Sequence, residues 1–247
     1  MRLTVLGACG AWPEAGQACS GFLVERDGFR LLLDCGYAVL PRLLEICDAD
    51  AVDAVYITHG HPDHCSDLNP LLRARALRDD PAPALPVWAP PGALDAVLAL
   101  DRPGMLDAAI AVHDVADEAK WRIGPFQARA RFLPHSRPNA GIRIEAGGRV
   151  LAYTGDCGSS PAVAELAGGA DLLIADASYV DEVPPDLTGT LTSARDAAGQ
   201  ARSAGVRRLM LTHLMPGTDR EAARTTAIAQ FGDAVVVAVP GLVVDLT

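Results

Sequence analysis

The chain has 247 residues, of which 50% are hydrophobic and 21% charged, and its formal net charge is −10. This composition can bury a sizeable core, which excludes an intrinsically disordered chain, and the length fits one domain spanning residues 1–247. The acidic balance disfavours nucleic acid as a partner, because such binding depends on clustered lysines and arginines.

No segment of the sequence predicts a membrane span. The longest nearly unbroken apolar stretch, residues 234–244, contains Pro240 and Gly241 and is shorter than the roughly 20 residues that cross a bilayer. The N-terminus lacks the apolar region and cleavage site of a signal peptide, so we expect a cytoplasmic protein. The six cysteines include no Cys-x-x-Cys pair, and we expect them to be mostly reduced, buried thiols.

Strands dominate the predicted elements at the start of the chain, and helices follow. Strands are predicted at 3–6, 21–25, 30–34 and 54–58, with a helix at 39–47. Helical patterns then occur at 67–77 and 93–100, with a short strand at 87–89 between them.

After residue 120 this outline repeats. The predicted strands are 126–133, 141–145, 149–153, 172–175 and 208–212, and the predicted helices are 192–204 and 219–231. Each half therefore places a sheet beside helices, which predicts an α/β fold with two layers of strand enclosed by helices.

The segment Thr58–His64 holds three imidazoles and one carboxylate directly after an apolar strand. A loop that leaves a strand end can fold these groups around two points in space, and Gly60 and Pro62 suit a tight bend. Only six histidines occur in the chain, so a chance gathering of three here is the weaker interpretation.

Other predicted strand ends carry the same types of residue. His135, Asp156 and His213 each come just after a predicted strand, so their side chains can converge with the first segment on one edge of the sheets. His113 lies in an acidic stretch instead, and we expect it to face solvent.

The His-x-His-x-Asp-His motif, the later lone histidine, the Gly-Asp pair and the final Thr-His resemble the metallo-β-lactamase-fold hydrolases over nearly the whole chain. Five further segments are most similar to the ribonuclease Z and related phosphodiesterase branch: Leu6–Gly10, Ser20–Val24, Leu33–Gly36, Tyr153–Asp156 and Leu211–Leu214. The resemblance implies a four-layer αββα sandwich with hydrolase activity.

This resemblance assigns seven side chains to two metal ions: His59, His61 and His135 to the first, Asp63, His64 and His213 to the second, and Asp156 to both. Zinc suits imidazole and carboxylate ligands, with iron and manganese as alternatives. Such a metal pair holds a water as hydroxide near neutral pH and polarises the substrate oxygen. Asp63 is then expected to orient the hydroxide and to accept its proton.

Two further aspartates and two cysteines lie close to these residues in the sequence. Asp34 can support a ligand histidine or cap a turn, and the sequence does not separate these interpretations. Asp176 is expected to support the site or the fold rather than to bind metal. Cys65 and Cys157 each follow a candidate ligand, and we expect both to point into the core rather than to join the site as thiolates.

Three polar residues follow His135 and are candidates for contact with the substrate: Ser136, Arg137 and Asn139. For each of them taken singly, a polar surface turn around Pro138 is the favoured interpretation.

Two departures from the ribonuclease Z branch bear on the substrate. The chain lacks the long Gly- and Pro-rich arm of the transfer-RNA-processing members, and the insert between His64 and His135 is acidic. Thr190 stands where the branch has a histidine that is thought to assist the leaving group or to hold the phosphate. The helix start beyond it is retained, because Thr192 or Ser193 can cap it.

We therefore expect a dinuclear metal-dependent hydrolase with a small-molecule substrate. A small phosphodiester such as a cyclic nucleotide is the first interpretation. A lactone, thioester or amide is the alternative that Thr190 favours. A non-catalytic metal-binding module is a third, which the complete ligand set with Asp63 disfavours. The sequence is compatible with a homodimer.

Overall fold

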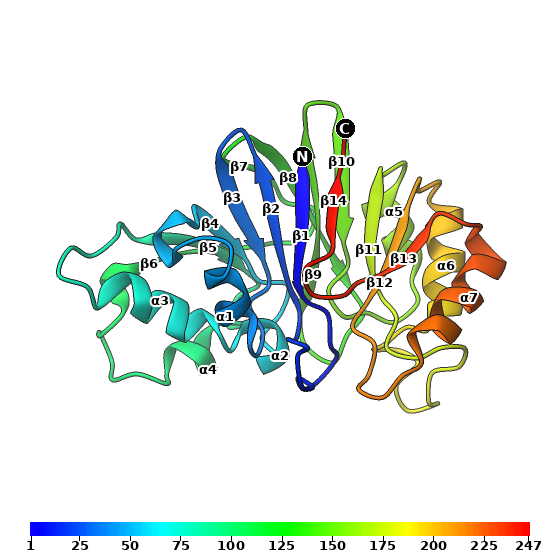
Figure 1. Ribbon diagram of the computed structural model, residues 1–247, viewed down its shortest axis with the longest axis horizontal. Helices are drawn as coiled ribbons and strands as arrows, with labels where there is room; N and C mark the ends of the chain where they lie inside the picture. The colour runs from blue at the N-terminus through cyan, green and yellow to red at the C-terminus, as the bar shows by residue number, and fades with distance from the viewer.

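Two mixed sheets of seven strands each form the centre of the protein, as the computed structural model of residues 1–247 shows (Figure 1). The first sheet has the order β14-β1-β2-β3-β4-β5-β6, antiparallel up to β3 and parallel from β3 to β6. Its strands are β1 (Arg2–Gly7), β2 (Gly21–Arg26), β3 (Phe29–Leu33), β4 (Ala54–Tyr56), β5 (Leu85–Ala89), β6 (Ile110–Asp114) and β14 (Val243–Asp245).

The second sheet has the order β13-β12-β11-β10-β9-β8-β7, and it is parallel from β10 to β13. The pairs β7–β8, β8–β9 and β9–β10 are antiparallel. Its strands are β7 (Lys120–Ile123), β8 (Phe126–Leu133), β9 (Asn139–Ala146), β10 (Arg149–Tyr153), β11 (Leu172–Asp176), β12 (Leu209–Thr212) and β13 (Val235–Val237).

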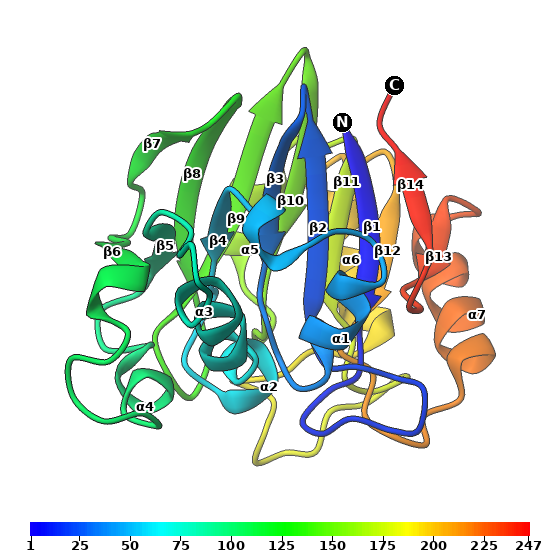
Figure 2. The same cartoon turned by 60° about the vertical axis from the view of Figure 1, so that its left-hand side comes forward.

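Helices cover the outer face of each sheet (Figures 1 and 2). Those on the first sheet are α1 (Val39–Leu44), α2 (Pro62–Cys65), α3 (Leu68–Ala76) and α4 (Asp95–Leu98), with short 3₁₀ turns at Ala49–Ala51 and Asp107–Ala109. Those on the second sheet are α5 (Pro161–Ala167), α6 (Ala194–Ser203) and α7 (Arg220–Phe231). The expected four-layer αββα sandwich is confirmed.

Three apolar layers hold the sandwich together, and the alternation of side chains along each strand explains them. In β2, Phe22 and Val24 point into a cluster of 26 buried residues between the two sheets. Leu23 between them points the other way, into a cluster of 23 buried residues under α1 and α3. A third cluster of 22 residues lies between the second sheet and its helices.

All four strands that the sequence pattern did not predict are edge strands, namely β6, β7, β13 and β14. An edge strand pairs on one side only and is often partly exposed, so its sequence lacks a continuous buried pattern. In β6, for example, the last three residues are exposed.

Two helices were also not predicted. α2 spans a single turn inside the histidine-rich segment. α5 begins with a recognisable signal, since the Ser160 side chain accepts a hydrogen bond from the Ala162 amide and Pro161 follows it. No helix of the structure combines the length and the apolar character that crossing a lipid bilayer requires.

Candidate metal centre

The strand ends that carry the candidate residues meet at one end of the sandwich, where α2 lies at the lower edge in Figure 1. The segment Thr58–His64 follows β4 of the first sheet. His135, Asp156 and His213 follow β8, β10 and β12 of the second sheet. The candidate site therefore lies where the two sheets adjoin.

Local backbone geometry fixes the histidine-rich segment. A Cβ at Gly60 would lie 2.6 Å from the carbonyl oxygen of Ala93, so the bend has no room for a side chain. His61 is extended, and Pro62 occupies the first turn of α2, where its missing N–H costs nothing. The single helical turn then places the side chains of Asp63 and His64 in the buried interior.

The first cluster of candidate ligand atoms contains His59, His61, His135 and Asp156. The Nδ1 atom of His61 lies 3.0 Å from Nε2 of His59 and 3.1 Å from Nε2 of His135. The Asp156 Oδ2 atom lies 3.7 Å from the first of these Nε2 atoms and 3.9 Å from the second.

The second cluster contains Asp63, His64, Asp156 and His213. The Nε2 atom of His213 lies 3.1 Å from Oδ2 of Asp63 and 3.2 Å from Oδ2 of Asp156. The Nε2 atom of His64 lies 3.1 Å from Oδ1 of Asp156 and 3.7 Å from Oδ2 of Asp63. Asp156 belongs to both clusters, with Oδ2 near the first and both oxygens near the second.

These distances fit metal coordination. Bonds of about 2.0–2.1 Å in tetrahedral geometry place neighbouring ligand atoms roughly 3.3 Å apart. Two facing atoms, Nε2 of His64 and Oδ1 of Asp156, are moreover buried without any hydrogen bond. Buried polar atoms normally have a partner, so this pair indicates that a group absent from the protein itself completes the site.

Asp34 orients His64 from outside the cluster. Its Oδ2 accepts hydrogen bonds from Nδ1 of His64 at 2.7 Å and from the Tyr153 hydroxyl at 2.7 Å, while Oδ1 accepts from the Thr58 amide at 2.7 Å. Protonation of His64 at Nδ1 leaves Nε2 free for a metal. Of the two interpretations of Asp34, the structure thus favours support of a ligand histidine.

His213 is oriented through Ser178. The Ser178 hydroxyl accepts from Nδ1 of His213 at 2.9 Å and donates to Oδ1 of Asp176 at 2.7 Å. Asp176 is in neither ligand cluster, so it supports the site, as the sequence predicted. Ser178 was not predicted, because a serine two residues beyond a strand has no distinctive pattern.

Two further histidines, His59 and His135, turn Nε2 towards the candidate metal centre, and a nearby oxygen contacts Nδ1 of each. Nδ1 of His59 lies 3.1 Å from the Thr58 hydroxyl. Nδ1 of His135 lies 2.8 Å from the backbone carbonyl oxygen of Thr190. The Thr190 hydroxyl itself donates to the carbonyl oxygen of Leu187 at 3.0 Å. Position 190 therefore adjoins the site, but its contribution is a carbonyl group rather than an acid.

The charges of the buried groups favour a bound cation. Burial alone would raise the pKa of Asp63 and Asp156, but the neighbouring His213 and His64 imidazoles outweigh it and hold both carboxyl pKa values below the usual range. Burial would lower the pKa of His213, but the neighbouring carboxylates raise it to about 10. Burial lowers the pKa of His59 well below its usual value, so this imidazole is neutral and can bind metal.

The loop after β1 also contacts the site. No role of this loop at the site was predicted from the sequence. The Ala11 amide donates to Oδ2 of Asp63 at 2.9 Å, and the His213 amide donates to the carbonyl oxygen of Ala8 at 3.0 Å. A Cβ at Gly10 would lie 2.6 Å from the carbonyl oxygen of His213. The glycine-containing segment Leu6–Gly10 is thus needed for close packing against the candidate metal centre.

The three residues after His135 differ in their roles. Ser136 and Arg137 are exposed, as expected of a surface turn. The surface-turn interpretation is wrong for Asn139, whose side chain is buried and donates to the carbonyl oxygens of Thr154 and Asp156 at 3.0 and 2.6 Å. Buried carbonyl groups need a hydrogen-bond donor, and the Asn139 side chain supplies it. Asn139 thereby fixes the backbone at Asp156.

Cys65 and Cys157 are buried in the apolar clusters beside α2 and α6, as expected. Burial raises the pKa of the Cys65 thiol to about 12 and that of Cys157 further, so neither forms a thiolate readily. All six cysteines are free. The predicted exposure of His113 is confirmed, and its ring stacks on Trp88 with the centroids 4.6 Å apart.

Comparison with known proteins gives consistent matches. Residues 29–214 match the model of the beta-lactamase superfamily domain. An uncharacterized protein of Mycobacterium leprae is 33% identical, covering 100% of this chain and 89% of its own, and ribonuclease Z of Haloferax volcanii is 30% identical, covering 87% and 84%. The crystal structure of the metallo-beta-lactamase fold protein YhfI from Bacillus subtilis has a TM-score of 0.88 at 28% identity, covering 98% of this chain and 97% of its own.

Proposed function

Because the chain belongs to the beta-lactamase superfamily and is a metal-dependent hydrolase of that fold, we propose that it hydrolyses a small phosphodiester with two divalent metal ions. The observation that carries this proposal is the pair of ligand clusters that share Asp156. Each cluster offers three further side chains, so each can hold one ion.

His59, His61 and His135 would hold the first ion, and Asp63, His64 and His213 the second, with Asp156 between them. We propose zinc, because imidazole and carboxylate donors suit it, with iron and manganese as alternatives. When bound, such a pair supplies Lewis-acid activation of a water and of the substrate oxygen.

Asp63 is the proposed general base. Its Oδ2 accepts a hydrogen bond from the Ala11 amide and lies in the ligand cluster, 3.1 Å from Nε2 of His213, whereas Oδ1 accepts no hydrogen bond from the protein. The carboxylate is thus fixed at one oxygen, and the other can orient the attacking water and accept its proton. The low pKa of Asp63 keeps the group ionised before the reaction.

The substrate class rests on the relatives and on the surface charge. A relative of 30% identity is named ribonuclease Z, which acts on the phosphodiester bonds of RNA. This chain has a net charge of −10, and most acidic residues of the insert 65–134 are exposed, which opposes binding of a long phosphate backbone. A small phosphodiester such as a cyclic nucleotide reconciles these two observations.

Thr190 favours a second candidate, the hydrolysis of a lactone, thioester or amide. Its carbonyl oxygen is engaged by His135 and its hydroxyl donates to Leu187, so position 190 provides no imidazole to protonate a leaving alkoxide. A thioester in particular would not need that acid, because a thiolate leaves without protonation more readily than an alkoxide.

A side-by-side assay separates the candidates. Purified protein of known metal content is tested on bis(p-nitrophenyl) phosphate, a panel of cyclic nucleotides, and chromogenic thioester, lactone and β-lactam substrates. We expect the highest kcat/KM on a cyclic nucleotide. Preference for a thioester, lactone or amide over every phosphodiester would overturn the first proposal in favour of the second.

A further inference from the structure

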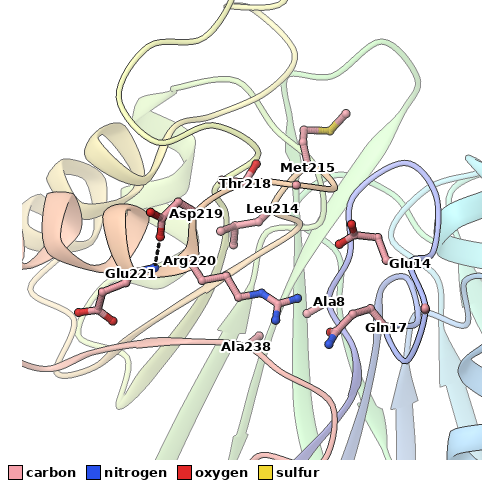
Figure 3. Close-up of a pocket in the computed structure, with 12 residues that line it drawn as sticks. Ala8, Glu14, Gln17, Leu214, Met215, Thr218, Asp219, Arg220, Glu221 and Ala238 are labelled. Carbon is pink, nitrogen blue, oxygen red and sulfur yellow. Dashed lines mark hydrogen bonds between the residues drawn. The ribbon is translucent and has the colours of Figure 1, made fainter.

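A cavity of about 550 Å³ lies between the loop after β1 and the segment that leads into α7 (Figure 3). Its floor is made by Ala8, Leu214 and Ala238, which are all buried. Its walls come from the loop after β1 and from the segment 214–221 that leads into α7. None of the seven candidate metal ligands lines it, although Leu214 directly follows His213.

Arg220 projects into this cavity without a partner. Its side chain extends from the start of α7 towards Ala8 and Gln17 in Figure 3. The residue is half-buried, yet its guanidinium forms no ion pair and no hydrogen bond, whereas Arg224 one turn later pairs with Glu221. The charge of Arg220 acts across the cavity, where it lowers the pKa of the Cys9 thiol against the larger effect of burial. A partly desolvated cation of this kind favours an anionic ligand.

Glu14 supplies the opposite charge on the facing wall (Figure 3). No ion pair within 4.0 Å joins it to Arg220. The other two carboxylates of the lining are already engaged, because Asp219 caps α7 and Glu221 pairs with Arg224. Glu14 accepts a hydrogen bond from the Cys9 thiol at one carboxylate oxygen, with Sγ 3.8 Å from Oε2, and its other oxygen is left for a ligand. The charged groups available to a ligand are thus Arg220 and Glu14, in a cavity with an apolar floor.

We propose that this cavity binds a small zwitterion of the amino-acid type, with its carboxylate on Arg220 and its ammonium group facing Glu14. A phosphate dianion fits less well, because the three carboxylates of the lining would repel its second charge. The apolar floor and the methylene groups of Met215 leave room for a short aliphatic side chain.

The cavity shares its walls with segments that hold the metal centre. The loop that carries Glu14 also carries Ala11, whose amide holds Asp63. The segment that carries Arg220 begins beside His213, whose amide is bonded to Ala8. A bound ligand therefore contacts the back of both segments, and it can restrict their motion without touching the metal ligands.

The test is ligand binding by the full-length, metal-loaded protein, measured by calorimetry and by the shift in Tm. The probes are the twenty standard amino acids, propionate as a carboxylate without an amine, and inorganic phosphate. We expect at least one aliphatic amino acid to bind more tightly than propionate or phosphate. Binding is measured without substrate, so a failure here is separate from a failure of the proposed hydrolase function.

Three variants locate the bound ligand. Arg220→Gln is expected to weaken amino-acid binding by about tenfold or more, since a hydrogen-bonded charge pair is lost. Glu14→Gln is expected to weaken amino-acid binding but not propionate binding. The control Arg202→Gln, at an exposed position of α6 outside the cavity, is expected to leave both unchanged.

A further variant guards against misfolding. Arg220→Lys keeps the charge, and it should retain part of the binding that Arg220→Gln loses while both keep the Tm of the ligand-free wild type. The proposal is overturned if no amino acid binds, if phosphate binds as tightly as any amino acid, or if Arg220→Gln and Arg202→Gln bind amino acids equally well.

Discussion

Single side chains outside the histidine motif determine which nitrogen each histidine turns towards the candidate metal centre. Asp34, Ser178 and the carbonyl group of Thr190 each engage an Nδ1 atom, which leaves the corresponding Nε2 atom to face the cluster. Such outer contacts tune both metal affinity and reactivity. The two residues that bear most directly on the proposed chemistry are Asp63 and Thr190.

Asp63→Asn should separate metal binding from water activation. The amide oxygen can still contact the metal and the Ala11 amide, but the group can no longer accept a proton. General-base assistance contributes on the order of 10²–10⁴-fold, so kcat should fall by about that factor while the fold persists. Turnover is measured together with metal content by elemental analysis. Wild-type turnover in the variant would remove Asp63 from the proposed mechanism.

Thr190→His tests the proposed substrate class. The backbone carbonyl that engages His135 is retained, while the new imidazole can supply a proton to a leaving group. For phosphodiesters with poor leaving groups we expect an increase on the order of 10²–10⁴-fold, with a much smaller effect on activated aryl esters. Thr188→His, at an exposed position nearby, is the matched control. Unchanged phosphodiesterase activity at full metal occupancy would count against the phosphodiester proposal.

Elements differ in how well the sequence predicts them, and their position in the sheets explains the difference. The bounds of β8 and β10 agree with the sequence prediction, because both are inner strands with buried residues. The edge strands were not predicted, and the helix predicted at 93–100 spans only Asp95–Leu98 in the structure. The candidate ligands were predictable because they follow inner strands, whereas Ser178 and the Ala11 amide act through contacts that only the folded chain creates.

The start of α6 provides a prediction at the scale of one element. Ser193 accepts a hydrogen bond from the Asp196 amide at 3.1 Å and donates to the Asp196 carboxylate at 3.0 Å. Ser193→Ala should lower the free energy of unfolding by about 1 kcal/mol, because one capping bond is lost. Denaturant unfolding measures this change, with Ser203→Ala at the exposed end of the same helix as the control. Equal stability of the two variants would show that the cap contributes nothing.

At the scale of the whole molecule, both sheets contribute to the candidate site, so metal binding should stabilise the entire sandwich. The ligand clusters join the segment after β4 with segments after β8, β10 and β12. Four buried carboxylates lie in or beside them, Asp34, Asp63, Asp156 and Asp176, and a bound cation offsets their charge.

We expect two metal ions per chain and a marked rise in Tm on loading. A ligand present at a hundredfold excess over its Kd stabilises the folded state by about 2.7 kcal/mol. Elemental analysis after reconstitution with zinc, iron or manganese gives the count, and calorimetry of the chelated and loaded protein gives the shift. A content near zero with all three metals would contradict the dinuclear proposal, and His113→Ala should leave both readouts unchanged.

The bonds that join Asp63 to His213, and Asp34 to Tyr153, link residues 150 and 119 positions apart in the chain. Closing such long loops costs conformational entropy before the contact forms and stabilises the chain, so this region should form late in folding. Metal capture then becomes the closing step of folding, and metal release becomes an early event when the two sheets separate. The bound ions would connect ligands from the two halves of the chain. The rate of metal loss would therefore report how often the two sheets separate.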